Sequence, residues 1–114
     1  MMKKHYRKLI RDRIPQIMDD ACVRYDVRRI DEAEYGTALR AKLIEEATEA
    51  AEAPRNELVK EIADVMEVVH ALAELEGIDL RDVENTRMAR LRLRGGFAER
   101  LLLAWAEDPE AGEN

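Results

Sequence analysis

The acidic stretch Lys42-Leu43-Ile44-Glu45-Glu46-Ala47-Thr48-Glu49 decides how this chain folds, together with Glu61-Ile62-Ala63-Asp64 further along. Each stretch carries a pair of carboxylates three positions apart: Glu46 with Glu49, and Glu61 with Asp64. Side chains three or four residues apart lie on one face of an α-helix, so each pair can hold a cation if the stretches are helical. Two such helices packed face to face would offer the oxygen ligands that Mg²⁺ and Mn²⁺ prefer.

The composition favours one small domain made of helices. A chain of 114 residues suffices for one hydrophobic core and is too short for two. Hydrophobic residues make up 46% but aromatic residues only 4%, so the core must consist of Leu, Ile, Val, Ala and Met. Glycine and proline, which interrupt helices, are scarce. We therefore expect a mainly α fold, an antiparallel helical bundle, with residues 1–107 as one domain and residues 108–114 as a polar tail.

Charge and cysteine content narrow the function classes. The net charge of −6 argues against binding of a nucleic-acid polymer. No apolar run approaches the roughly 20 residues of a membrane span, and Met1–His5 leads into no signal-peptide core. The single Cys22 allows no intrachain disulfide and fits a reducing compartment. These features predict a cytoplasmic protein that is not attached to a membrane.

Basic segments flank an acidic centre. Residues 3–13 and 87–100 are rich in Lys and Arg, whereas acidic side chains dominate between them. A site that binds a metal ion and a polyphosphate needs this distribution, but many ordinary helical proteins show it too. The distribution therefore decides nothing by itself.

Two short elements are expected before the acidic stretch. Asp12 can cap a helix over residues 13–21, with Pro15 tolerated in its first turn. Residues 23–30 alternate apolar and charged side chains, and this period of two predicts a short β-strand.

A long helix should follow and carry the first acidic pair. Asp31 and Glu34 form a capping box that starts this helix, and its pattern continues to about Ala53. On a helical wheel its apolar stripe spans about 40°: Leu39, Leu43 and Ala50. Glu46 lies only about 20° from Leu39 on the same wheel. A carboxylate at the rim of an apolar stripe is unfavourable unless it is paired or bound to a metal ion.

The second acidic pair should lie on the next helix. Pro54 interrupts the chain, Asn56 can cap the second helix, and Gly77 ends it. Its buried stripe is predicted at Leu58, Ile62, Val65, Val69 and Leu72. Glu61 and Asp64 flank that stripe. Because the connection is short, the two helices should be antiparallel neighbours whose acidic pairs meet.

The C-terminal part is predicted to hold one more helix. This helix should span about residues 80–93, between Asp79 and Gly95-Gly96. Residues 97–104 fit either a strand or a last helix, and we favour a strand that pairs with residues 23–30.

The residues alone leave two interpretations open. Acidic runs occur by chance on the solvated helix faces of a chain with 25 acidic residues, yet here Glu46, Glu61 and Asp64 all lie beside apolar stripes. A metal site and an acidic surface therefore both fit. Arg94-Gly95-Gly96 likewise fits a phosphate contact, since a phosphate can closely approach backbone that lacks a Cβ, or simply a helix end followed by a turn.

The acidic motifs resemble those of a known superfamily. Glu45-Glu46-x-x-Glu49 and Glu61-x-x-Asp64 are similar to the signature of the MazG-like all-alpha nucleoside triphosphate pyrophosphohydrolases. Residues 8–15 (Lys-Leu-Ile-Arg-Asp-Arg-Ile-Pro) and 94–97 (Arg-Gly-Gly-Phe) resemble its branch of house-cleaning enzymes for noncanonical nucleotides. The resemblance covers about residues 5–104, with its motifs in the expected order.

The resemblance implies a helical, Mg²⁺-dependent enzyme, with Mn²⁺ as a substitute, that cleaves nucleoside triphosphates to a monophosphate and pyrophosphate. It implies a set of metal ligands: Glu46, Glu49, Glu61 and Asp64. Glu45 would orient or deprotonate the attacking water. The resemblance places further side chains near phosphate or base: Lys8, Arg11, Asn85, Arg87 and Arg94. Arg87 stands where the wider superfamily has the lysine of an Asn-x-Lys motif.

The sequence leaves rival functions open. A non-catalytic helical module would use the acidic faces for oligomerisation or partner binding. A related pyrophosphohydrolase would act on another nucleotide, such as phosphoribosyl-ATP. The thin core expected of two long helices with few aromatics predicts a homo-oligomer, at least a dimer, with a four-helix core shared between copies.

Overall fold

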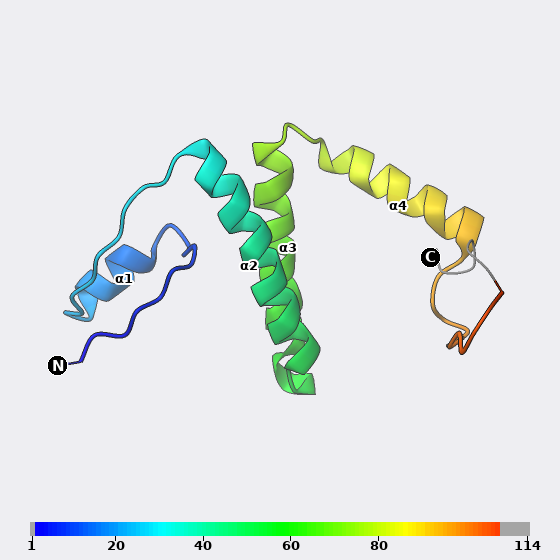
Figure 1. The fold of residues 1–114 in the computed structure, drawn as a ribbon, viewed down its shortest axis with the longest axis horizontal. Coiled ribbons are helices and arrows are strands. Elements are labelled where there is room, and N and C mark those ends of the chain that lie inside the picture. The colour runs from blue at the N-terminus through cyan, green and yellow to red at the C-terminus, as the bar shows by residue number, and fades with distance from the viewer. Residues whose placement is uncertain (1, 108–114) are drawn as a thin grey trace. The chain divides into compact units, whose positions relative to one another are not determined.

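A computed structural model describes residues 2–107, and its regular structure is helical (Figure 1). The helices of this range are α1 (Ile14–Asp20), α2 (Glu32–Glu52), α3 (Leu58–Leu75) and α4 (Leu80–Arg94), with a 3₁₀ turn at Arg55–Glu57. The predicted mainly α fold is therefore confirmed. Within residues 2–107, no helix is both long and apolar enough to cross a membrane. The predicted tail, residues 108–114, lies outside the described range.

The β-strands predicted at residues 23–30 and 97–104 are wrong, because neither segment forms a strand. The chain turns at the start of the second segment, where the Arg100 N–H donates to the Phe97 carbonyl at 3.0 Å. An extended segment becomes a strand only when a neighbour accepts and donates its backbone hydrogen bonds. Alternation of apolar and charged residues supplies the right faces, but it does not supply that neighbour.

The chain divides into two compact units, Met1–Gly77 and a second unit that begins at Ile78. The first unit contains α1, α2 and α3, and the second contains α4. Within the first unit, α2 and α3 lie side by side as an antiparallel pair, as predicted (Figure 1).

Asp and Gly residues set the ends of the long helices as predicted. Asp31 Oδ1 accepts the N–H of Glu34 at 2.8 Å and starts α2. Asp79 Oδ1 accepts the N–H of Arg81 at 2.8 Å and starts α4. Gly77 (φ +67°) follows α3, and Gly95 (φ +81°) follows α4. Both glycines adopt the left-handed conformation that side chains disfavour, which explains why the helices stop there.

The side-chain caps predicted at Asp12 and Asn56 are wrong. Arg13 is the N-cap of α1 and makes no side-chain capping bond, although Pro15 does lie in the first turn. Asn56 lies inside the 3₁₀ turn that precedes α3. Backbone bonds order both starts, since Ile14 donates to the Arg11 carbonyl at 3.1 Å and Glu57 donates to the Pro54 carbonyl at 3.0 Å. The observed contact at both starts is thus a backbone hydrogen bond and not a side-chain cap.

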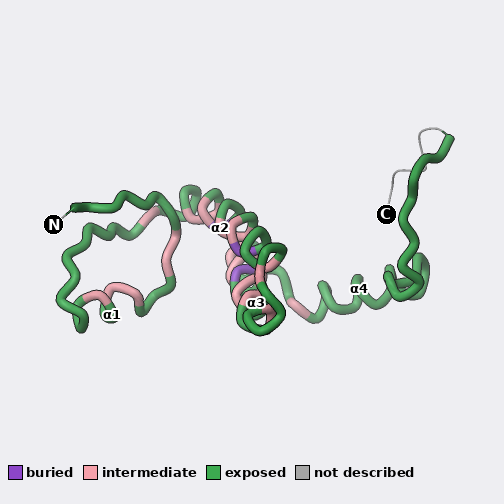
Figure 2. The backbone as a smooth tube through the Cα atoms, turned by 90° about the horizontal axis from the view of Figure 1, so that it is seen from below, coloured by how far each residue is buried: buried purple, intermediate pink, exposed green. Residues whose placement is uncertain are grey.

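Burial is concentrated where α2 meets α3 (Figure 2). On α2, Leu39 is only 2% exposed and Glu46 only 7%, so the wheel correctly placed this carboxylate on the apolar face. On α3 four of the five predicted positions are half-buried, but Ile62 is 51% exposed, and Val68, which lies outside the predicted stripe, is buried. The buried face is therefore closer to the side of α3 that carries Glu61 than the stripe predicted.

Leu39→Ala should lower the free energy of unfolding by roughly 2–5 kcal/mol, because it leaves a cavity at the most buried side chain of the α2–α3 interface. Urea denaturation followed by circular dichroism measures the change. Leu93→Ala is the matched control, since Leu93 is 82% exposed and its truncation should change stability by no more than about 0.5 kcal/mol. Equal losses in the two variants would contradict the assigned core.

Candidate metal centre

The carboxylates of α2 and α3 meet between the two helices and form one acidic cluster: Glu45, Glu46, Glu49, Glu61 and Asp64. One oxygen each from Glu46, Glu61 and Asp64 lies within 4.8 Å of the others. The same distance limit holds for one oxygen each from Glu45, Glu46 and Glu49. Glu46 belongs to both groups and is therefore the centre of the cluster.

Two carboxylate oxygens of the cluster are buried and unsatisfied. Within residues 2–107, Glu46 Oε2 and Glu61 Oε2 have no hydrogen-bond partner. Buried polar atoms are normally paired, because a buried atom without a partner loses its hydrogen bonds to water and gains no other hydrogen bond. Two such oxygens in one cluster fit a bound cation that they would share. The donor set consists of carboxylate oxygens, which suits a hard divalent ion such as Mg²⁺ or Mn²⁺.

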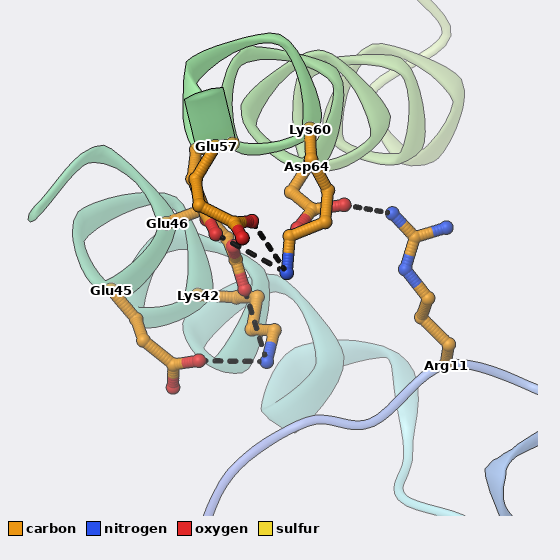
Figure 3. Close-up of polar contacts among 8 residues, drawn as sticks. Arg11, Lys42, Glu45, Glu46, Glu57, Lys60 and Asp64 are labelled. Atoms are coloured by element: carbon orange, nitrogen blue, oxygen red, sulfur yellow. Dashed lines mark hydrogen bonds and ion pairs between the residues drawn. The ribbon is translucent and has the colours of Figure 1, made fainter. Parts of the chain in front are cut away.

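Cationic side chains hold the other oxygens of the same carboxylates (Figure 3). Lys42 Nζ lies 3.4 Å from Glu46 Oε1 and donates to Glu45 Oε2 at 2.9 Å. Lys60 Nζ lies 3.5 Å from Glu61 Oε1. Each of these lysines takes one oxygen of a carboxylate and leaves the second oxygen unpaired. Such outer contacts orient metal-binding side chains.

The N-terminal segment also reaches the cluster. Arg11 Nη2 donates to Asp64 Oδ1 at 2.9 Å, and Lys8 Nζ lies 3.8 Å from Glu45 Oε2. Figure 3 shows the Arg11 guanidinium extending from this segment to the carboxylate on α3. The structure thus brings the predicted residues Lys8 and Arg11 to the acidic cluster.

The directions in which pKa values shift indicate that negative charges lie close together in the acidic cluster. The negative charge of Glu46 is the main cause that raises the pKa of Glu49. Glu45 differs, because its hydrogen bond from Lys42 lowers the pKa of its carboxyl group. Burial lowers the pKa of Lys42, but its contacts with Glu45 and Glu46 outweigh burial and leave that pKa raised. The lysine therefore stays charged, and a divalent cation would relieve the remaining repulsion.

The other predicted substrate contacts lie on α4, in the second unit: Asn85, Arg87 and Arg94. All three are exposed, and the Arg87 guanidinium donates to Glu84 Oε1 at 2.6 Å on its own helix. Their part in substrate binding stays a prediction.

Sequence reasoning missed the role of Lys42 and Lys60 at the cluster. A signal was present, because Lys42 precedes Glu45 by three positions and Glu46 by four, and such spacing brings side chains together on a helix. Lys60 carried no such signal, because it directly precedes Glu61 and adjacent residues of a helix do not face each other. Its side chain is largely exposed, yet its ammonium group pairs with Glu61 at the edge of the cluster.

Comparison with known proteins adds an independent finding. The family model described as phosphoribosyl-ATP pyrophosphohydrolase matches residues 5–90, which is well over half of the chain. This family is part of the MazG-like all-alpha superfamily, so the resemblance of the acidic motifs is confirmed. No curated protein and no solved structure gives a significant match.

Glu46→Gln should weaken Mn²⁺ binding by roughly 10- to 100-fold, because it removes the negative charge of the one residue that belongs to both three-residue groups of the cluster. Titration followed by the electron paramagnetic resonance of free Mn²⁺ measures the affinity. Glu52→Gln makes the same change at an exposed position of α2 outside the cluster and should leave the affinity unchanged. Unaltered binding in Glu46→Gln would refute the metal centre.

Proposed function

We propose a substrate, a metal and residue roles for this chain from the premise that it belongs to the phosphoribosyl-ATP pyrophosphohydrolase family and is a nucleotide pyrophosphohydrolase. Its substrate is a nucleoside triphosphate, noncanonical ones included, cleaved between the α and β phosphates. The products are a nucleoside monophosphate and pyrophosphate. The observation that carries this proposal is the pair of buried, unpartnered oxygens of Glu46 and Glu61 at the centre of the acidic cluster.

Charge explains why the reaction needs a metal ion. A triphosphate and the acidic cluster are both strongly negative and repel each other. Mg²⁺, with Mn²⁺ as a substitute, would neutralise the phosphates and the developing charge of the pyrophosphate leaving group. The residues that would hold it are Glu46, Glu49, Glu61 and Asp64.

Glu45 is proposed to act on the attacking water. Its carboxylate lies beside Glu46 and is fixed by the hydrogen bond from Lys42 at 2.9 Å. That bond lowers the pKa of Glu45, so the group is ionised at neutral pH and ready to accept a proton from water. A lowered pKa also makes it a weaker base, so holding the water in line with the α phosphorus is the larger part of its task.

Cationic residues near the cluster are proposed to bind phosphate. Lys8 and Arg11 already lie against its carboxylates. A divalent ion bound to Asp64 would compete with Arg11 for that carboxylate and leave the guanidinium available for a phosphate oxygen. Asn85, Arg87 and Arg94 on α4 are further proposed contacts to phosphate or base, as the sequence motifs implied.

Phosphoribosyl-ATP is the second candidate substrate, and the family match favours it. Its hydrolysis breaks the same bond and also releases pyrophosphate. The acidic cluster acts on phosphate groups that the two substrates share, so the cluster does not distinguish them.

Pyrophosphate release from a panel of nucleotides tests the function. The panel contains standard and modified dNTPs and phosphoribosyl-ATP, each with Mg²⁺. Glu61→Gln should lower kcat/KM on the best substrate roughly 100-fold or more, about 2.7 kcal/mol of transition-state stabilisation. Glu67→Gln, an exposed change on the same helix, should have no effect.

Each outcome of this panel selects among the candidates. Undiminished activity of Glu61→Gln would reject the proposed ligand set. Release from phosphoribosyl-ATP alone would replace the triphosphate substrate with the second candidate. No release from any nucleotide would contradict the proposed activity and favour a non-catalytic module.

We also propose that two copies of the chain associate through the α2–α3 pair. An apolar stripe on α3 spans about 60° and is largely exposed: Val59 (75%), Ile62 (51%) and Met66 (50%). A second copy of the same helix pair would cover this stripe and complete a four-helix core.

Light scattering at micromolar concentration should give the mass of a dimer or a larger oligomer. Ile62→Asp should shift the protein to monomer, because it places a charge in the proposed interface. Ile17→Asp, an equally exposed apolar position on α1, is the control and should leave the assembly intact. A monomer mass for the unmodified protein would rule out this association.

A further inference from the structure

A cavity of about 170 Å³ lies beside the acidic cluster, between the N-terminal segment and α2. Its charged lining consists of Arg7, Lys8, Lys42 and Glu45. Leu9 and two alanines of α2 provide the apolar part of its wall. We call this cavity the basic pocket. Three cations against one carboxylate make its lining positive, in a chain whose net charge is −6.

The cations of the basic pocket retain hydrogen-bonding capacity. Within residues 2–107, Arg7 makes no ion pair or side-chain hydrogen bond, so its donors are available to a ligand. Lys42 is 15% exposed and directs its ammonium group to Glu45 and Glu46, which leaves one of its three N–H donors. Lys8 lies at a looser 3.8 Å from Glu45. These groups suit a ligand that carries several anionic oxygens.

The basic pocket and the acidic cluster are continuous along α2. Glu45 belongs to both, and Lys42 precedes Glu46 by one helical turn, about 6 Å along the axis. This separation suits the length of a polyphosphate chain. A substrate whose α phosphate lies at the acidic cluster would therefore extend its outer phosphates towards the N-terminal end of α2.

We propose that the basic pocket binds the β and γ phosphates, which leave as pyrophosphate, and that Arg7 and Lys42 are phosphate-binding residues. This inference rests on the proposed function and orients the substrate: the outer phosphates point towards the N-terminal segment and the nucleoside points away from it. It also defines the substrate class as triphosphates, because a diphosphate has no γ phosphate to place in the pocket.

Inorganic pyrophosphate is the direct probe of the basic pocket. Isothermal titration calorimetry of the full chain with pyrophosphate and Mg²⁺, at fixed ionic strength, should show binding of pyrophosphate. Arg7→Gln and Lys42→Gln should each weaken its affinity about 10-fold. Arg40→Gln is the matched control, because Arg40 is exposed on α2 and lies outside the pocket lining. It removes the same charge and should leave the affinity unchanged.

Arg7→Gln is the cleaner of the two variants, because Arg7 contacts none of the cluster carboxylates, whereas Lys42 helps to hold two of them. Its circular dichroism and its Mn²⁺ affinity should equal those of the unmodified protein. Its preference for a nucleoside triphosphate over the corresponding diphosphate, measured as a ratio of kcat/KM values, should fall about 10-fold.

Pyrophosphate affinity that is equal in the unmodified protein and in Arg7→Gln would overturn the inference, and so would an equal loss in Arg40→Gln. An unchanged triphosphate preference in Arg7→Gln would overturn it as well. These results leave the proposed function standing if the unmodified protein releases pyrophosphate from nucleotides. Arg7-dependent pyrophosphate binding without hydrolysis of any nucleotide would instead support the pocket and reject the proposed function.

Discussion

The ion pair between Lys42 and the buried carboxylate of Glu46 is the contact on which the site depends. Glu46 lies where α2 packs against α3, so its charge must be compensated inside the interface. Lys42 approaches one of its oxygens, and the other oxygen is buried without a partner. The Glu46 carboxylate also lies close to those of Glu61 and Asp64. The packing of the two helices and the geometry of the acidic cluster are therefore linked, because Glu46 belongs to both.

The counter-charges around this cluster come from three directions. Lys42 lies on α2, Lys60 on α3, and Arg11 on the N-terminal segment. The pair formed by Arg11 and Asp64 joins residues far apart in the sequence, so it ties the N-terminal segment to the helix pair. These Lys and Arg side chains stabilise the carboxylates when no metal is bound. Next to a bound metal they are suitably placed for an anionic substrate, which links the acidic cluster to the basic pocket.

Much of the local structure was predictable because it depends on short-range geometry. The capping bonds of Asp31 and Asp79 and the left-handed glycines Gly77 and Gly95 are set by neighbouring backbone. The predictions that failed depended on neighbours from elsewhere. The alternating residues 23–30 lack a paired strand, and the buried face of α3 is centred nearer Val68 than Ile62. A helical wheel predicts which residues share a face of one helix, but the neighbouring helix that packs against it determines which face is buried.

The sequence by itself determined the helices, the helix ends that Asp31, Asp79 and the two glycines fix, the spacing of both acidic pairs and the position of Glu46 on the apolar face of α2. Each of these follows from the 3.6-residue period and local capping. The tertiary structure decided which atoms meet. Only the packing of α3 on α2 brings Glu61 and Asp64 to Glu46, and only the path of the N-terminal segment places Arg7 and Lys8 beside Lys42. These contacts join segments distant in sequence, and no local period encodes them.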